Sequence, residues 1–353
     1  MKLPAFTLGL VALATIATFG GQAPAPAAGP NRTITAVTGI KVGHHTLAER
    51  PTGCTVILVD GEGAVGGVSQ RGGAPGTRET DLLDPSNMVD KVNAVVLAGG
   101  SAFGLDAATG AVRWLEEHNM GWDVRIAKVP IVPAAILFDL PVGGNPKIRP
   151  TADCGYRAAV DASSAPVREG TIGAGAGATV GKSGGQGRAM KSGLGSYSIT
   201  LPSGLTVGAI VAVNAVGDII DPDTGKVVAG VRNPDGTFAD ARTLLRTGQT
   251  GPRPRAGENT TIGLVATNAT LTKSQVHRMA LMADDGFARA IFPSHTMGDG
   301  DTVFSLATGK FTGEVDITQV GALAADVMAR AIVRAVTEAT GIPNLPAVRD
   351  LKR

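Results

Sequence analysis

The sequence predicts an α/β protein, and its carboxy-terminal third gives the clearest reason. Residues 260–267 and 302–307 are short runs of β-branched and apolar residues, which are typical of buried strands. Each run precedes a segment with apolar residues at helical spacing, residues 272–291 and residues 317–340. Strands that alternate with helices of this length are typical of an α/β fold.

The residues before position 260 supply further strands and shorter helices. Apolar runs predict strands at residues 33–37, 53–59, 94–98, 196–201 and 207–213, and a buried segment at 131–139. Helices are expected at residues 105–118 and from about residue 158 onward. Glycine-rich residues 64–78 predict an exposed loop, and polar residues 232–258 predict a surface linker.

Composition excludes some classes of partner. The 353 residues carry a net charge of +2, so no strongly basic surface indicates nucleic acid. Residues 1–28 contain Lys2, an apolar run at 6–19 and then small residues, which is typical of a signal peptide, with an uncleaved membrane anchor as the alternative. We therefore expect export to the periplasm or the exterior, and no membrane span after the signal is removed. In an oxidising compartment, Cys54 and Cys154 either pair or stay as two buried thiols.

The tract from residue 257 to residue 268 carries the most chemical information. Asn259 and two hydroxyl residues, Thr260 and Thr261, stand directly before the apolar strand that begins at residue 260. A threonine with a free α-amine carries a nucleophile and a base in one residue. The tract therefore predicts cleavage at Asn259–Thr260 by the chain's own hydroxyl, which leaves Thr260 as a new amino terminus.

Other polar residues are candidate partners of Thr260. Lys182 follows a glycine-rich stretch and either is solvated or stabilises a developing oxyanion. Asn214 ends an apolar strand, so it is either a satisfied core amide or a donor to the attacked carbonyl. Asp299 and Asp301 precede a strand and can orient an ammonium group and tune its pKa.

Several other motifs are weaker indications of a binding site. Residues 176–183 match a relaxed phosphate-binding loop but open no helix. Residues 299–301 lack the remaining ligands of a calcium loop. Gly100 and Ser101 follow a strand and precede a helix, a turn that either packs tightly or aims N–H groups at a ligand. No histidine or cysteine cluster has metal-ligand spacing, so we expect neither a metal nor a cofactor.

The chain resembles the DmpA-like peptidases, which are N-terminal-nucleophile hydrolases. The resemblance rests on residues 257–268, 99–106, 133–139 and 295–302, and it extends from about residue 35 to residue 340. It implies a four-layered αββα fold shared with ornithine acetyltransferases. It also implies a precursor cut into two chains, here residues 29–259 and 260–353, which stay together and form homo-oligomers of such pairs.

Two branches of that family are relevant. Its aminopeptidases typically place Ser after Gly at the cut, whereas its 6-aminohexanoate-oligomer (nylon) hydrolases place Thr after Asn, as Asn259 and Thr260 do here. The resemblance to the nylon-hydrolase branch implies that Lys182, Asn214, Asp299 and Asp301 are catalytic. Phe138 stands where that branch has a tyrosine, so one hydrogen bond to substrate or intermediate is missing.

The resulting hypothesis is a self-processing hydrolase of peptides or peptide-like linear amides, including 6-aminohexanoate oligomers. An aminopeptidase that releases L-, D- or β-residues is the alternative. An ornithine-type acetyltransferase shares the expected fold and cleavage, but an exported enzyme has little use for that pathway. A non-catalytic exported binding protein would show no cleavage.

Overall fold

The computed structural model describes Met1, residues 31–251 and residues 257–351. The predicted signal peptide, residues 1–28, lies outside this part of the chain apart from Met1. None of the helices in the described part combines the length and apolar character that crossing a membrane requires. The division into chains at residue 28 and at Asn259–Thr260 stays a prediction.

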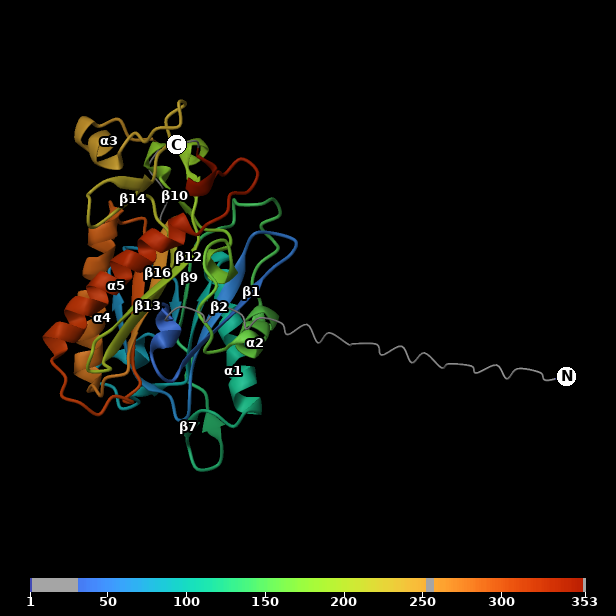
Figure 1. Cartoon of the computed structure of the whole chain (residues 1–353), viewed down its shortest axis with the longest axis vertical. Coiled ribbons are helices and arrows are strands. Elements are labelled where there is room, and N and C mark those ends of the chain that lie inside the picture. Colours follow the sequence, from blue (N-terminus) through green and yellow to red (C-terminus); the bar gives the residue numbers. More distant parts are fainter. Residues whose placement is uncertain (2–30, 252–256, 352–353) are drawn as a thin grey trace. The chain divides into compact units, whose positions relative to one another are not determined.

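Two β-sheets form the centre of the fold (Figure 1). Sheet 1 has the strand order β1 (Ile40–Thr46), β2 (Gly53–Val59), β6 (Ala94–Ala98), β9 (Ala134–Ile136) and β4 (Thr77–Arg78). Sheet 2 has the order β12 (Leu194–Thr200), β13 (Thr206–Asn214), β16 (Thr260–Thr267), β18 (Thr302–Ala307), β3 (Ala64–Gln70) and β5 (Lys91–Val92). Three small sheets add β10 (Thr179–Val180) with β11 (Met190–Lys191), β7 (Trp122–Asp123) with β8 (Lys128–Val129), and β15 (Val227–Ala229) with β14 (Asp218–Ile220) and β17 (Ile291–Phe292).

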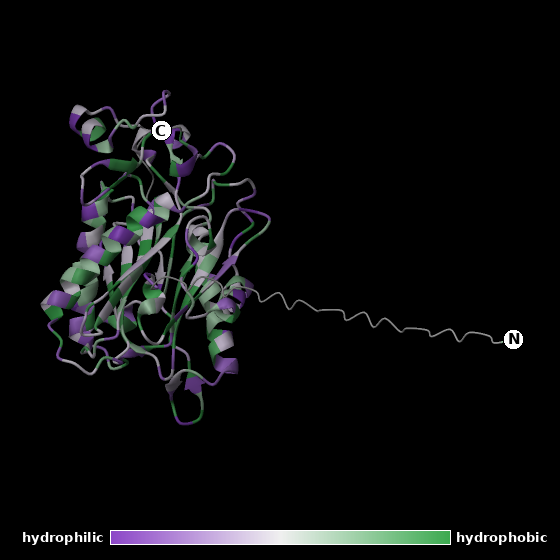
Figure 2. Ribbon diagram, viewed as in Figure 1, coloured by the Kyte–Doolittle hydropathy of each residue, from purple (hydrophilic) through white to green (hydrophobic). Residues whose placement is uncertain are grey.

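The helices cover the outer faces of the two sheets. Helices α1 (Ala107–Glu117) and α2 (Ala152–Asp161) pack on sheet 1, while α4 (Lys273–Ala290) and α5 (Ile317–Thr337) pack on sheet 2. A third cluster of buried residues, including Ile57, Leu97 and Leu264, fills the space between the sheets. Hydrophilic residues gather on the outward sides of the helices and in the loops (Figure 2). The layers are therefore αββα, which confirms the expected fold.

The remaining helical segments are short. Helix α3 (Ala241–Thr247) lies within the predicted linker. The 3₁₀ turns are η1 (Ile34–Ala36), η2 (Asp81–Leu83), η3 (Ser101–Asp106), η4 (Gly173–Gly175), η5 (Lys182–Gly184), η6 (Gln186–Arg188) and η7 (Val348–Asp350).

Two amino-terminal predictions are wrong. Residues 33–37 form the turn η1 instead of a strand, and the first strand is β1. Residues 64–78 contain β3 and β4 instead of one exposed loop. The glycines there serve close packing, because a Cβ on Gly67 would lie 2.8 Å from the backbone nitrogen of His277 in α4. Helix α2 also begins at Ala152, earlier than expected.

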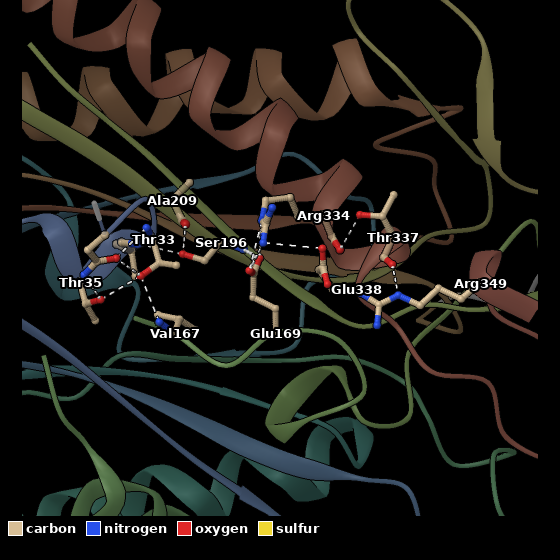
Figure 3. Close-up of polar contacts among 12 residues, drawn as sticks. Thr33, Thr35, Val167, Glu169, Ser196, Ala209, Arg334, Thr337, Glu338 and Arg349 are labelled. Atoms are coloured by element: carbon tan, nitrogen blue, oxygen red, sulfur yellow. Dashed lines mark hydrogen bonds and ion pairs between the residues drawn. The ribbon is translucent and has the colours of Figure 1, made fainter. Parts of the chain in front are cut away.

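A polar network joins segments on both sides of the predicted cut (Figure 3). Glu169 accepts hydrogen bonds from the Ser196 backbone of β12 and from the Arg334 guanidinium of α5, each at 2.8 Å. The Val167 backbone donates to the Thr33 hydroxyl at 3.0 Å. Since β18 also lies between β16 and β3 in one sheet, cleavage at residue 259 would leave two chains that share one core.

The structure joins Cys54 of β2 and Cys154 of α2 in a disulfide that ties the outer helix layer to sheet 1. The bond closes a loop between residues 100 positions apart. We expect the paired Cys54→Ala and Cys154→Ala replacement to lower the free energy of unfolding by about 2–4 kcal/mol, because the unfolded chain regains freedom. Urea denaturation with and without reductant measures this. Reduced wild type should lose a similar amount, and equal stability of all three samples would contradict the prediction.

Candidate active site

The site is built around Thr260, the first residue of β16. Strand β16 lies inside sheet 2, antiparallel to β13 and parallel to β18. Thr260 pairs with Asn214, the last residue of β13, and its exposed fraction is only 2%. The sheet register therefore brings together two of the predicted site residues at the end of neighbouring strands.

Two donors contact the carbonyl oxygen of Asn259 in the uncut chain. The Thr260 hydroxyl donates to it at 2.5 Å, and the Gly300 backbone N–H donates to it at 2.9 Å. The hydroxyl thus lies beside the peptide carbonyl that it is predicted to attack. A donor on the carbonyl oxygen stabilises negative charge that develops there. Gly300 was not among the predicted site residues.

Lys182 is buried and bound to Asn214. Its Nζ donates to the backbone oxygen and to Oδ1 of Asn214, both at 3.0 Å. Thr179 donates to the same Oδ1 through its backbone and its hydroxyl, and Asn214 Nδ2 donates to the Phe138 carbonyl at 3.0 Å. An ammonium has three N–H groups and an amide nitrogen has two. Each side chain therefore has one N–H beyond these contacts for a reacting carbonyl.

The two predicted carboxylates hold the loop before β18 against the start of β16. Asp301 Oδ1 accepts the Thr261 backbone N–H at 2.8 Å. Asp299 Oδ2 accepts the Thr296 backbone N–H at 2.7 Å, while its buried Oδ1 has no hydrogen-bond partner in the described part of the chain. Asn259 forms an isolated parallel bridge with Asp299. The Asp299 carboxylate therefore keeps an acceptor beside the predicted cut.

Burial shifts the pKa values of Lys182 and Asp299 in the direction that favours the uncharged form of each group. It lowers the pKa of Lys182 to about 7, against the attraction of Asp299 and other acidic groups. Burial, with the repulsion of Asp301, raises the pKa of Asp299 to about 6. Both groups therefore titrate close to neutral pH, which is typical of functional sites.

A glycine-rich segment packs against the carboxylate loop. The Ala74 N–H donates to the Asp299 carbonyl at 2.8 Å. A Cβ on Gly72 would lie 2.3 Å from the backbone nitrogen of Asp301, and one on Gly73 would lie 2.7 Å from Met297 Cα. Glycine at these positions lets the segment between β3 and β4 approach the site closely.

The turn after β6 does not present its first N–H groups to a ligand. The Gly100 N–H donates to the Asp139 carboxylate at 2.9 Å, and the Ser101 N–H donates to the Leu137 carbonyl at 3.0 Å. The packing interpretation of this turn therefore fits its backbone better than an oxyanion role. Phe138 contributes its carbonyl to Asn214, and its side chain is half-buried.

Metal ligands do not gather in the site. Within residues 31–251 and 257–351, no group of three or more His, Cys, Asp or Glu side chains is arranged to hold a metal ion. The expectation that catalysis needs neither a metal nor a cofactor stays a prediction.

In this four-layered fold a buried threonine lies beside a lysine, an amide and two carboxylates, which are groups that can support catalysis by a hydroxyl nucleophile. The chain belongs to peptidase family S58, whose family model matches residues 32–346. It is therefore an amide hydrolase of the peptidase class.

Three known proteins illustrate the relationship. An uncharacterized aminopeptidase of Mycobacterium leprae is 46% identical, over 90% of this chain and 94% of that protein. The 6-aminohexanoate-oligomer endohydrolase of Paenarthrobacter ureafaciens is 31% identical, over 84% of each chain. The structure of the L-aminopeptidase D-Ala-esterase/amidase of Ochrobactrum anthropi superposes with a TM-score of 0.67, at 21% identity and 90% coverage of both chains. That structure is described as a variant of the Ntn-hydrolase fold, which supports the fold alone.

We expect processing of the uncut chain to have a bell-shaped pH dependence. Asp299 is ionised above its pKa of about 6, and Lys182 is charged below its pKa of about 7. If cleavage needs both charges, the rate rises through pH 6 and falls through pH 7. The measurement is the rate at which fragments appear from freshly translated precursor. A rate that still rises above pH 8 would instead make neutral Lys182 the base.

Proposed function

We propose that this protein is a self-processing hydrolase that cuts its own Asn259–Thr260 bond and then uses Thr260 as an amino-terminal nucleophile. The observation that carries the proposal is the pair of contacts on the Asn259 carbonyl oxygen, from the Thr260 hydroxyl at 2.5 Å and from Gly300 at 2.9 Å. These two contacts exist in the uncut chain, which supports a role for Thr260 as nucleophile and for the Gly300 N–H as oxyanion donor.

Processing follows from this geometry in three steps. Thr260 Oγ attacks the Asn259 carbonyl carbon, and Gly300 stabilises the negative oxygen. The carbon–nitrogen bond then breaks as the proton lost by Oγ passes to the leaving nitrogen, so the acyl group is held on Oγ as an ester and the Thr260 amine is released. Water hydrolyses the ester and leaves a carboxylate on Asn259. Asp299 Oδ1, which has no hydrogen-bond partner in the described residues, supports this route because it can accept a hydrogen bond from the new amine.

Turnover would use the same residues on an external amide. The Thr260 amine takes the proton from Oγ as Oγ attacks the substrate carbonyl, and an acyl-enzyme forms as the substrate amine leaves. Lys182 and Asn214 stabilise the oxyanion with their remaining N–H groups. Asp299 and Asp301 orient the amine. Water then releases the acyl group and restores Thr260.

The substrate is a peptide or a peptide-like linear amide, including 6-aminohexanoate oligomers. The Asn-Thr cleavage site and the related oligomer endohydrolase support oligoamides. The higher identity to a mycobacterial aminopeptidase supports the alternative, release of amino-terminal residues. A panel of an L-aminoacyl anilide, a D-aminoacyl amide, a β-peptide and a 6-aminohexanoate oligomer separates the two, and turnover of the oligomer alone would exclude the aminopeptidase.

The cleavage itself is tested by the intact mass of the purified wild-type protein. Two fragments that meet at Asn259–Thr260 and elute together on gel filtration are expected. One uncut chain that still hydrolyses amides would contradict the self-processing proposal. Light scattering on the same sample tests whether the chain pairs form the homo-oligomer that the family resemblance implies.

Export to the periplasm or the exterior is part of the same proposal. The signal-like residues 1–28 support it, as does the disulfide between Cys54 and Cys154, since disulfides persist in oxidising compartments. Cell fractionation together with amino-terminal sequencing tests it. A protein that stays in the cytoplasm with its first residues intact would contradict export.

A further inference from the structure

His295 holds one oxygen of Asp301 from two directions. It lies in the loop between β17 and β18, and both its backbone N–H and its ring Nδ1 lie 3.0 Å from Asp301 Oδ2. Its φ of 56° places it in the left-handed region, where a residue other than glycine is strained unless its surroundings fix it. In this conformation both the backbone N–H and the ring Nδ1 of His295 face Asp301 Oδ2.

Helix α4 holds the other side of the His295 ring. The ring stacks on Phe287 of α4 with centroids 5.6 Å apart. Asp301, His295 and α4 therefore form a continuous chain of contacts from β16 to the outer helix layer.

The charges around this ring favour its cationic form. Burial opposes the charge, but the hydrogen bond and charge of Asp301 together with the charge of Asp284 raise the pKa of His295 above its usual value. Asp284 also accepts a hydrogen bond from Ser69 and faces Arg71 at 3.5 Å.

The carboxylate loop adds two more charges. Asp299 lies two residues before Asp301, and the two carboxylates repel each other. Lys182 in η5 attracts Asp299 and so weakens the effect of this repulsion on its pKa. A cation on His295 therefore offsets part of the repulsion between the two carboxylates.

We propose that His295 is a positioning residue that fixes the Asp301 carboxylate on the Thr261 N–H and so aims the start of β16 for cleavage. This rests on the proposed function, because it assigns a role within the same self-processing site. His295 touches neither the Asn259 carbonyl nor the Thr260 hydroxyl in the described contacts. It acts through Asp301, whose Oδ1 binds the residue next to the nucleophile at 2.8 Å.

Three variants test this on the full-length precursor. His295→Asn keeps a short neutral donor and a residue type that tolerates positive φ. His295→Ala removes the donor, and Asp284→Asn removes a negative charge that acts on the His295 ring. His118→Asn is the matched control, because His118 is exposed at the end of α1. The readouts are the thermal unfolding midpoint, the cleavage rate and the pH profile of that rate.

The expected result is a change in rate and pH profile in a folded protein. His295→Asn should cleave about tenfold more slowly. Its acid limb, which Asp299 sets, should move up by about one pH unit, because without a cation beside Asp301 more of the Asp301 repulsion acts on Asp299. His295→Ala should slow cleavage by about 100-fold. Asp284→Asn should instead move the alkaline limb to lower pH, because the charge of Asp284 raises the pKa of His295 and its loss lets the ring lose its proton earlier. This variant provides the test if both His295 variants fail to fold.

Failure of this proposal is distinguishable from failure of the proposed function. If wild type is cut at Asn259–Thr260 and the folded variants are cut at its rate with an unshifted pH profile, His295 has only a structural role. If wild type is not cut there, the proposed function itself fails.

Discussion

Thr260→Ala is expected to remain one uncut chain without amide hydrolase activity. The substitution removes the hydroxyl that lies 2.5 Å from the Asn259 carbonyl oxygen, and with it the only attacking group that the proposed mechanism uses. The Gly300 donor stays in place, but a donor without a nucleophile cannot form the ester intermediate. Intact mass of the purified variant and activity on the substrate panel measure the two losses.

Thr260→Ser is the matched control for this variant. Serine keeps the hydroxyl and loses only the methyl group, so cleavage at the same bond is expected to continue. Circular dichroism should show that both variants fold, because the side chain is small and the strand around it is unchanged. Fragments that meet at residue 259 in Thr260→Ala would exclude the Thr260 hydroxyl as the attacking group.

Some elements could be predicted from the sequence because their boundaries carry strong local signals. Strands β16 and β18 begin and end where the apolar runs predict, and helices α4 and α5 agree within a few residues. The run of residues 260–267 is apolar and β-branched, and its central place in sheet 2 explains why it is buried on both faces.

The amino-terminal half was harder because its glycines serve tertiary packing. Gly66 and Gly67 lie inside β3, although glycine in a sequence usually indicates a turn. The atoms that require glycine there belong to α4 and to residues 83 and 92, which lie far away in sequence. Local sequence patterns contain no information about such neighbours.

In the site, too, some residues could be predicted from local sequence and others depend on tertiary structure. Lys182, Asn214, Asp299 and Asp301 were predicted from residue type and family resemblance, and the structure gathers them around Thr260. The proposed roles of Gly300 and His295 depend on a backbone N–H and on a loop conformation, which residue type does not reveal. The only available signal was their place in the motif of residues 295–302.

Gly300→Ala is expected to slow both processing and turnover by at least about 100-fold, the usual effect of losing one oxyanion donor. An alanine Cβ at this position would lie 2.8 Å from Thr260 Oγ and 2.8 Å from the Ala74 carbonyl oxygen. The Ala74 contact is with backbone, so either the nucleophile or the loop must move. Each movement separates the Thr260 hydroxyl or the Gly300 N–H from the Asn259 carbonyl.

Gly187→Ala is the matched control for this variant, because a Cβ on exposed Gly187 would meet no atom within 4 Å. It should be cut at the wild-type rate and unfold at the wild-type temperature. The rates of fragment formation and of hydrolysis are compared for the two variants, with thermal unfolding as the check on folding. If folded Gly300→Ala is cut as fast as Gly187→Ala, the clearance around Thr260 and the Gly300 donor do not limit the reaction. In that case the oxyanion would have to be stabilised by Lys182 and Asn214 alone, since they are the remaining donors beside Thr260 that the mechanism assigns.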